Sequence, residues 1–194
     1  RGWQLWSELF DQCREDWQID LCRRLLREIK RTDSKSAPSP MILVLAHSAE
    51  GMLAAHLGQW PQAIRLYQQA IAEAQMLDDR DSEADLIANL GTIQYLAEHI
   101  PEAIQCFQQA RERYAAIGQI RGLVVTLINL GSLYRDTADL AEAQACYQAA
   151  LEHLANLDRP DLEAATLANL ALLNHRQGDS RQAIERYQHA GRLF

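Results

Sequence analysis

Small and aromatic residues recur along this chain with a fixed period. An alanine occurs every 40 residues from Ala63, an aromatic residue follows each alanine by four positions, and a second alanine follows each aromatic residue by three. The set comprises Ala63, Tyr67 and Ala70, then Ala103, Phe107 and Ala110, then Ala143, Tyr147 and Ala150, and finally Ala183, Tyr187 and Ala190. Positions four and seven apart share one face of a helix. The pattern therefore predicts one helix per period with a small–aromatic–small face.

A second motif ends twelve residues before each of these helical faces. Ala88-Asn89-Leu90-Gly91 recurs as Ile128-Asn129-Leu130-Gly131 and Ala168-Asn169-Leu170-Ala171, and weakly as Ser48-Ala49-Glu50-Gly51. A small last residue lets two helix backbones approach closely, and the aromatic side chain fills the space under the crossing. Each period thus predicts two helices joined by a tight turn. The expected helices span 41–57, 60–77, 84–97, 100–117, 121–137, 140–157, 161–177 and 180–194.

Turn signals agree with this division. Gly58 and Gly178 fall between the two helices of their pairs. Pro61 and Pro101 fall in the first turn of a second helix, where a missing N–H costs little. The residues expected to cap second helices are Asp139 and Asp179. The polar segment 78–83 is predicted to be a link between two pairs.

These motifs together resemble the tetratricopeptide repeat family, whose usual unit has about 34 residues. The 40-residue unit is similar to the longer-helix variant found in kinesin light chains, spindle-orientation adaptors and many bacterial regulatory proteins, so we expect a bacterial source. The resemblance implies an all-α fold, a right-handed α-solenoid of helix-turn-helix repeats over 41–194. The expected units are 44–83, 84–123, 124–163 and 164–194. Glu50 and Ala171 depart from the pattern, as expected for end units.

The first forty residues follow a different pattern. The apolar stripe of Trp3, Trp6, Phe10, Cys13 and Trp17 has helical spacing. We expect residues 1–40 to form an N-terminal helical cap, a degenerate helix pair followed by a loop. Packing within this cap is the favoured role of the tryptophans, and a ligand-binding box is the alternative.

Charge and cysteine content narrow the function classes. The chain has 19 basic and 26 acidic residues, a net charge of −7, which disfavours nucleic acid as a partner. No apolar run approaches the length of a membrane span. Four scattered cysteines favour a reducing, cytoplasmic compartment. Because the chain begins at Arg1 rather than Met, we expect it to be an excised fragment.

Motifs for catalysis are missing from the sequence. It has no glycine-rich phosphate loop, no Gly-x-Ser-x-Gly, no His-Glu-x-x-His and no Cys-x-x-Cys. Cys106 and Cys146 share one repeat position and are expected to be small core residues. The six histidines form no chelating pair. We therefore predict a non-catalytic chain with no cofactor and no metal.

Three asparagines are the most informative polar residues. Asn89, Asn129 and Asn169 occupy one repeat position, although asparagine is a mediocre helix-interior residue. In a stacked array they would form a column, and the family resemblance implies that this column lies on the concave face and holds the backbone of a peptide. A carboxamide suits that task because it has both a donor and an acceptor. Alternatively, each asparagine bonds a neighbouring helix and stabilises the stack.

Residues about one turn from these asparagines are expected to complete a peptide-binding groove. They are Thr92, Tyr95, Ser132, Arg135, Leu172, His175 and Arg176. The resemblance also locates the positions that clamp a terminal carboxylate in co-chaperone members. None of them is lysine here, so chaperone tails are not the expected ligand.

The predicted function is non-catalytic recognition of an extended peptide, either from another protein or from another domain of the parent chain. A second hypothesis is a self-associating assembly scaffold, because Leu193 and Phe194 close the chain without a polar cap. End-to-end association between copies would follow. A third hypothesis is a regulatory domain of a larger signalling protein or protease.

Overall fold

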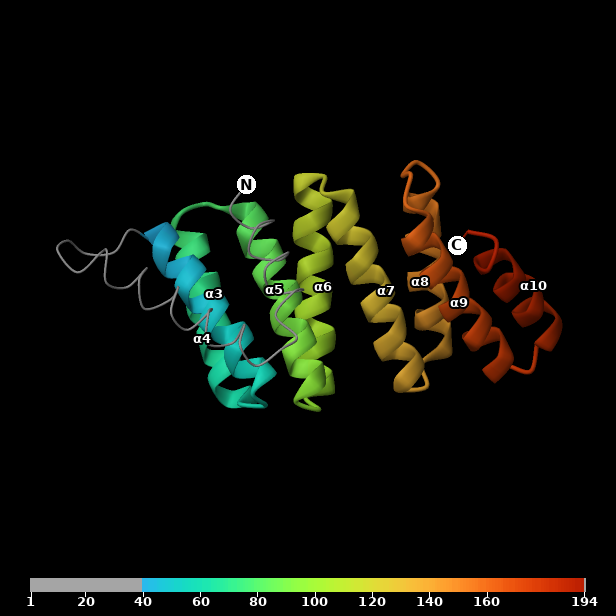
Figure 1. Cartoon of the computed structure of the whole chain (residues 1–194), viewed down its shortest axis with the longest axis horizontal. Helices are drawn as coiled ribbons and strands as arrows, with labels where there is room; N and C mark the ends of the chain where they lie inside the picture. Colours follow the sequence, from blue (N-terminus) through green and yellow to red (C-terminus); the bar gives the residue numbers. More distant parts are fainter. Residues whose placement is uncertain (1–39, 194) are drawn as a thin grey trace. The chain divides into compact units, whose positions relative to one another are not determined.

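Short turns join the helices of this protein in pairs (Figure 1). The computed structural model describes residues 40–193, which form eight helices and no strand. These helices are α3 (Pro40–His56), α4 (Trp60–Met76), α5 (Arg80–Leu96), α6 (Ile100–Ile117), α7 (Ile120–Asp136), α8 (Leu140–Leu154), α9 (Pro160–Arg176) and α10 (Ser180–Ala190). One compact unit ends at Asp79 and a second begins at Arg80. The predicted tryptophan-rich cap lies outside the described residues.

Within each pair the second helix packs against the first: α4 on α3, α6 on α5, α8 on α7 and α10 on α9. In the second unit, α6 also packs against α7, and α8 against α9, so consecutive pairs form a continuous stack from α5 to α10. The all-α fold predicted from the 40-residue period is confirmed. None of the eight described helices has the length and apolar character needed to cross a membrane.

The boundary predicted at 78–83 is wrong. Helix α5 begins at Arg80 and includes most of the segment expected to be a link. Asp81 and Glu83 lie in its first turn, where carboxylates interact favourably with the helix dipole. Glu83 is also buried and forms an ion pair with Arg113 of α6 at 3.2 Å. An acidic sequence that looks like a solvated loop is thus part of a packed helix.

The turns between paired helices use one left-handed residue each. Gly58 and Gly178 adopt positive φ angles of 70° and 85°, as glycine does readily. Glu98 and Ala138 occupy the equivalent turns of the two middle pairs, with φ of 63° and 65°. Asp179 caps α10 by accepting a hydrogen bond from the Gln182 backbone N–H.

Two further boundary predictions need correction. Asp139 holds the N-cap position of α8, but its side chain accepts no hydrogen bond there. Helix α10 ends at Ala190 instead of continuing to 194. Leu193, expected to be exposed at the chain end, packs partly buried against Ala164, Leu167 and Ala190. Phe194 lies outside the described residues.

Close contact between a first-helix glycine and a second-helix ring recurs in three pairs. A Cβ atom added to Gly51 would lie 2.7 Å from the Tyr67 ring, and one added to Gly131 would lie 2.6 Å from the Tyr147 ring. The equivalent distance from Gly91 to the Phe107 ring is 3.1 Å. These rings are buried against backbone that only glycine leaves open.

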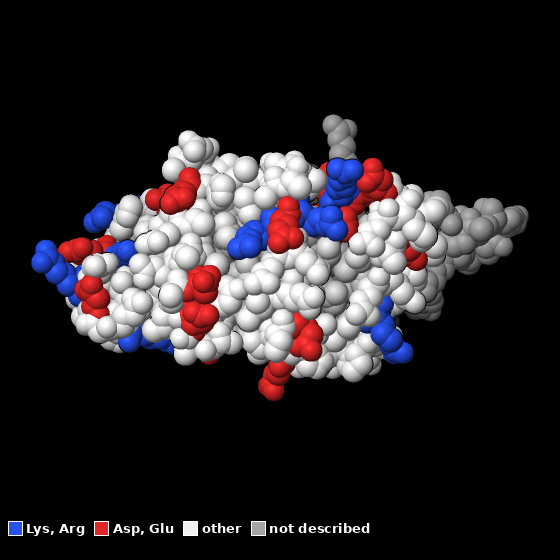
Figure 2. Space-filling model, turned by 180° about the vertical axis from the view of Figure 1, so that it is seen from behind, with Lys and Arg blue, Asp and Glu red and all other residues white. Residues whose placement is uncertain are grey.

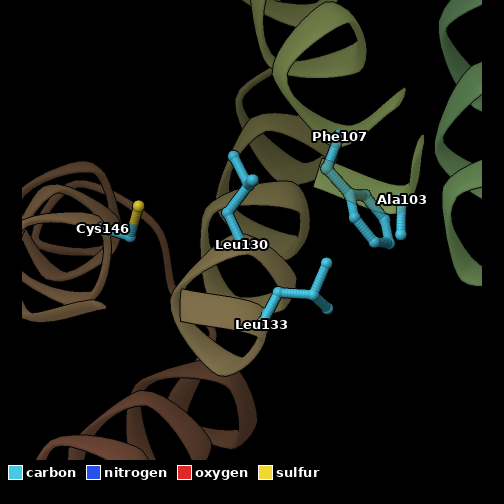
Figure 3. Packing of buried hydrophobic residues seen from close by; sticks show 5 residues of the cluster. All are labelled: Ala103, Phe107, Leu130, Leu133 and Cys146. Atoms are coloured by element: carbon cyan, nitrogen blue, oxygen red, sulfur yellow. The ribbon is translucent and has the colours of Figure 1, made fainter. Parts of the chain in front are cut away.

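Each of two aromatic rings is then covered by a leucine pair from the next first helix. Phe107 and Ala103 of α6 pack with Leu130 and Leu133 of α7 and with Cys146 of α8 (Figure 3). Tyr147 and Ala143 of α8 pack in the same way with Leu170 and Leu173 of α9. Each of these aromatic rings therefore contributes to the core in two ways, by contacts within its own helix pair and by contacts with the next pair.

The last described pair departs from this arrangement. Ala171 replaces the glycine, and no further helix follows α10 among the described residues. Tyr187, the fourth aromatic residue of the series, is 46% exposed, and Ile184 on the same helix is 57% exposed. In this series the aromatic residue is thus buried in the three pairs that have a glycine opposite it and exposed in the pair that has an alanine.

The glycine contact predicts the effect of one methyl group. Replacing Gly131 by Ala forces the Tyr147 ring outward against Leu170 and Leu173, so we expect a loss of about 1–3 kcal/mol in the free energy of unfolding. Urea denaturation measures this loss. Gly191→Ala is the matched control, because its added Cβ meets no atom closer than 3.4 Å. Equal stability of both variants would show that the ring is free to move.

A buried tyrosine makes stability dependent on alkaline pH. Tyr114 of α6 donates a hydrogen bond to Asp85 of α5 at 2.6 Å. Burial and the nearby Asp85 carboxylate raise the pKa of Tyr114 above its usual value of 10.0. The folded state therefore holds this proton more tightly than the unfolded state.

Because the pKa is raised in the folded state, its contribution is complete below pH 10 and is lost as the pH rises further. We expect the free energy of unfolding to fall above about pH 10 and the decline to be shallower in Tyr114→Phe. Urea denaturation series at several pH values compare the two proteins. A variant whose decline matches that of the parent would contradict this assignment.

Candidate functional site

Each first helix of the second unit carries one of the three predicted asparagines, Asn89 on α5, Asn129 on α7 and Asn169 on α9. The leucine that follows each of them is buried, while the asparagines themselves are half-buried. We call the surface of α5, α7 and α9 that carries them the first-helix face. In α5 and α7 the glycines that contact the rings of Phe107 and Tyr147 lie two residues after these asparagines.

Two of the asparagines make no hydrogen bond through their side chains to any residue of 40–193. These are Asn89 and Asn129, and neither has an amide atom both buried and unpaired. Because a carboxamide provides a donor and an acceptor, each can offer both to another molecule. Neither side chain stabilises the packing of helices in this part of the chain through a hydrogen bond.

Asn169 differs from the other two. Its Oδ1 accepts a hydrogen bond from Nη1 of Arg135 at 3.0 Å, across from α7 to α9. A guanidinium group can only donate, so the oxygen of Asn169 must face it and the Nδ2 group must point elsewhere. Asn169 therefore contributes to the stacking of α9 on α7, as the stack-stabilising hypothesis expects, whereas Asn89 and Asn129 show no such contact among residues 40–193.

A chain of polar contacts ties the three first helices together near their C-terminal ends. The Tyr95 hydroxyl on α5 donates to Oδ2 of Asp136 on α7 at 3.1 Å. Arg135 donates to Oδ1 of the same carboxylate at 3.1 Å. Arg176 on α9 donates to the backbone carbonyl of Arg135 at 3.1 Å. The hydrogen bond to Asp136 is the main reason why the pKa of Tyr95 is raised.

The remaining predicted site residues divide into two groups. The hydroxyls of Thr92 and Ser132 donate to the backbone of their own helices, to Ala88 at 3.3 Å and Ile128 at 3.0 Å. Ser132 also forms a hydrogen bond with the Tyr147 hydroxyl at 3.1 Å. Leu172 is half-buried and His175 is exposed on α9.

The charges on the first-helix face do not balance. Arg135, whose side chain is only 14% exposed, is paired with Asp136. Arg176 is exposed and has no carboxylate within ion-pair distance in the part of the chain that the structure describes. The molecule seen from behind presents acidic and basic side chains interspersed, without a broad field of one sign (Figure 2). Residues 40–193 contain no group of three His, Cys, Asp or Glu that could hold a metal ion.

The sequence pattern selects Arg135 and Asn169 separately but does not reveal the contact between them. The partners are 34 residues apart for Arg135 and Asn169, and 41 apart for Tyr95 and Asp136. The separation of 41 is within one residue of the 40-residue period, whereas 34 is six residues short of it; both pairs join neighbouring first helices. Polar residues about 40 positions apart are the sequence signal that could have identified the hydrogen bond between Tyr95 and Asp136.

Most of this chain matches a known family of repeat sequences. The sequence model of the tetratricopeptide repeat matches residues 43–116 and 123–194. The chain belongs to the tetratricopeptide repeat family. This confirms the resemblance inferred from the 40-residue motifs.

Solved tetratricopeptide repeat-like structures share the fold at low sequence identity. BtubC (BKLC) from P. vanneervenii is 23% identical with a TM-score of 0.79, covering 90% of this chain and 72% of that one. A putative kinesin light chain from Podosopora anserina is 16% identical with a TM-score of 0.77, covering 96% and 91%. NprR in complex with its cognate peptide NprX is 20% identical with a TM-score of 0.65, covering 91% and 50%. No curated protein matches the sequence.

The unequal bonding of the asparagines predicts unequal effects on stability. Asn169→Ala removes the acceptor of the Arg135 hydrogen bond and should cost about 0.5–1.5 kcal/mol of unfolding free energy. Asn129→Ala removes no bond within the described chain and should change that free energy little. Parallel urea titrations of the two variants test the difference. Equal losses would mean that Asn129 also has a structural role.

Proposed function

We propose that this chain is a non-catalytic protein-interaction module whose first-helix face binds an extended peptide segment. The observation that carries the proposal is the state of Asn89 and Asn129, which are half-buried and have no side-chain hydrogen bond to any residue of 40–193. The peptide unit of an extended segment needs one donor and one acceptor, and a carboxamide supplies both. Two such groups one repeat apart suit a backbone regardless of its side chains.

Membership of the tetratricopeptide repeat family and the fold of relatives support this proposal. NprR, a structural neighbour, is a protein in complex with its cognate peptide NprX. The segment bound by the present chain comes from another protein or from another domain of its own parent protein. Tyr95, Thr92, Ser132, Leu172 and His175 border the asparagines and set the preference for side chains.

The two described thiols fit a non-catalytic role. Burial is the main cause that raises the pKa of Cys106 and Cys146 to about 11, so both remain protonated at neutral pH. A thiol is a poor nucleophile in that state. In this proposal the chain has four repeat units, 44–83, 84–123, 124–163 and 164–194, with a cap at 1–40. Half-buried Cys106 lies in the second unit and buried Cys146 in the third.

Self-association is a second candidate function, favoured by the exposed apolar side chains of α10. Ile184 and Tyr187 lie on the helix that ends the described stack. Apolar patches of this kind commonly mark interaction sites. Light scattering of the parent and of Ile184→Glu at two concentrations tests this candidate. A mass that stays monomeric throughout would reject it.

Binding to a positional-scanning library of decapeptides tests the first proposal. Asn129→Ala should weaken binding of the selected peptides by about 0.5–1.5 kcal/mol while the melting temperature stays within error of the parent. Asn156→Ala is the matched control, because it removes an exposed asparagine that lies outside the first-helix face. Absence of any binding peptide, or undiminished binding by Asn129→Ala, would contradict the proposed function.

A further inference from the structure

Two side chains with unused hydrogen-bond donors lie at the α7–α9 end of the first-helix face. The oxygen of Asn169 is occupied by Arg135, so the free part of that carboxamide is its Nδ2 donor group. Arg176 uses one bond to the backbone carbonyl of Arg135, and none of its other N–H groups has a partner among residues 40–193. The groups left for a ligand here are donors.

The opposite end of the column has a different character. Asn89 retains both its donor and its acceptor, and Asp136, the carboxylate of the polar network, already accepts from Tyr95 and Arg135. The two ends of the first-helix face therefore offer different groups to a ligand. Neutral carboxamides lie toward α5, and an uncompensated cation lies toward α9.

We propose that the segment bound by this face places an aspartate or glutamate side chain against Arg176, beyond Asn169 on α9. This inference rests on the proposed function and specifies its ligand. A carboxylate accepts from a guanidinium group in charge-assisted bonds, which are stronger than neutral ones. The site is distinct from the carboxylate-clamp positions of co-chaperones, which are Ser48, Met52, Ala88, Thr92, Ile128 and Ser132 here and include no cation.

The position of Arg176 favours a side chain over a C-terminal carboxylate as the source. Arg176 lies seven residues, about two helical turns, beyond Asn169 on α9. A backbone held by the asparagine column therefore passes Asn169 first and reaches Arg176 only through a side chain directed toward the helix end. Arg135 lies between them, with its own charge neutralised by Asp136.

The test uses the positional-scanning decapeptide library, prepared both as free acids and as C-terminal amides, with the parent chain and two variants. Arg176→Gln removes the uncompensated cation. Arg181→Gln makes the same change in net charge on α10, where the side chain is 90% exposed and pairs with Glu185. Circular dichroism melts confirm that both variants are folded.

We expect the parent to prefer Asp or Glu at one position of the amidated peptides by about two- to fivefold, the range for an exposed ion pair. Arg176→Gln should lose this preference and Arg181→Gln should keep it. Arg176→Glu should reverse it toward Lys or Arg.

Four results would overturn the inference. Peptides that bind the parent without an acidic preference, or an acidic preference that survives Arg176→Gln, would refute it and leave the proposed function intact. A preference found only in the free-acid library would assign the carboxylate to a C-terminus instead. If no peptide binds the parent, the proposed function fails, and this inference fails with it.

Discussion

The contact between a glycine on one helix and an aromatic ring on the next is the constraint on which the rest of the structure depends. Gly131 leaves room for the Tyr147 ring, and that ring is in turn covered by Leu170 and Leu173 of the following helix. Close packing of this kind leaves little freedom in the position of either helix. Where the pattern changes, at Ala171, the ring of Tyr187 is exposed.

Burial of one side of each first helix determines which polar side chains lie on its other side. Because Leu90, Leu130 and Leu170 are committed to the core, the asparagine beside each one is held at the edge of the first-helix face. The polar ties then join α5, α7 and α9 on that face. The result is a surface with fixed spacing, which reduces the entropy lost when an extended ligand binds.

The 40-residue period made the helix pairs predictable, because each unit has small and aromatic side chains at the same positions. Local sequence was a poorer guide where tertiary contacts prevail: the acidic residue Glu83 looked solvated, yet it is buried against Arg113. The asparagine column was predictable as a position, and its two possible roles were not separable from sequence. The contact from Arg135 to Asn169, by which Asn169 differs from the other two, depends on side-chain geometry between repeats.

The central claim is that the free carboxamides of Asn89 and Asn129 hold a peptide backbone. Side-chain amide resonances in a ¹⁵N-correlated NMR titration with a library-selected peptide test it most directly. The account predicts that the Asn89 and Asn129 resonances shift and saturate together, while those of Gln109 and Gln148 on the second helices stay in place. Saturable binding that leaves both asparagine resonances unmoved would contradict the account.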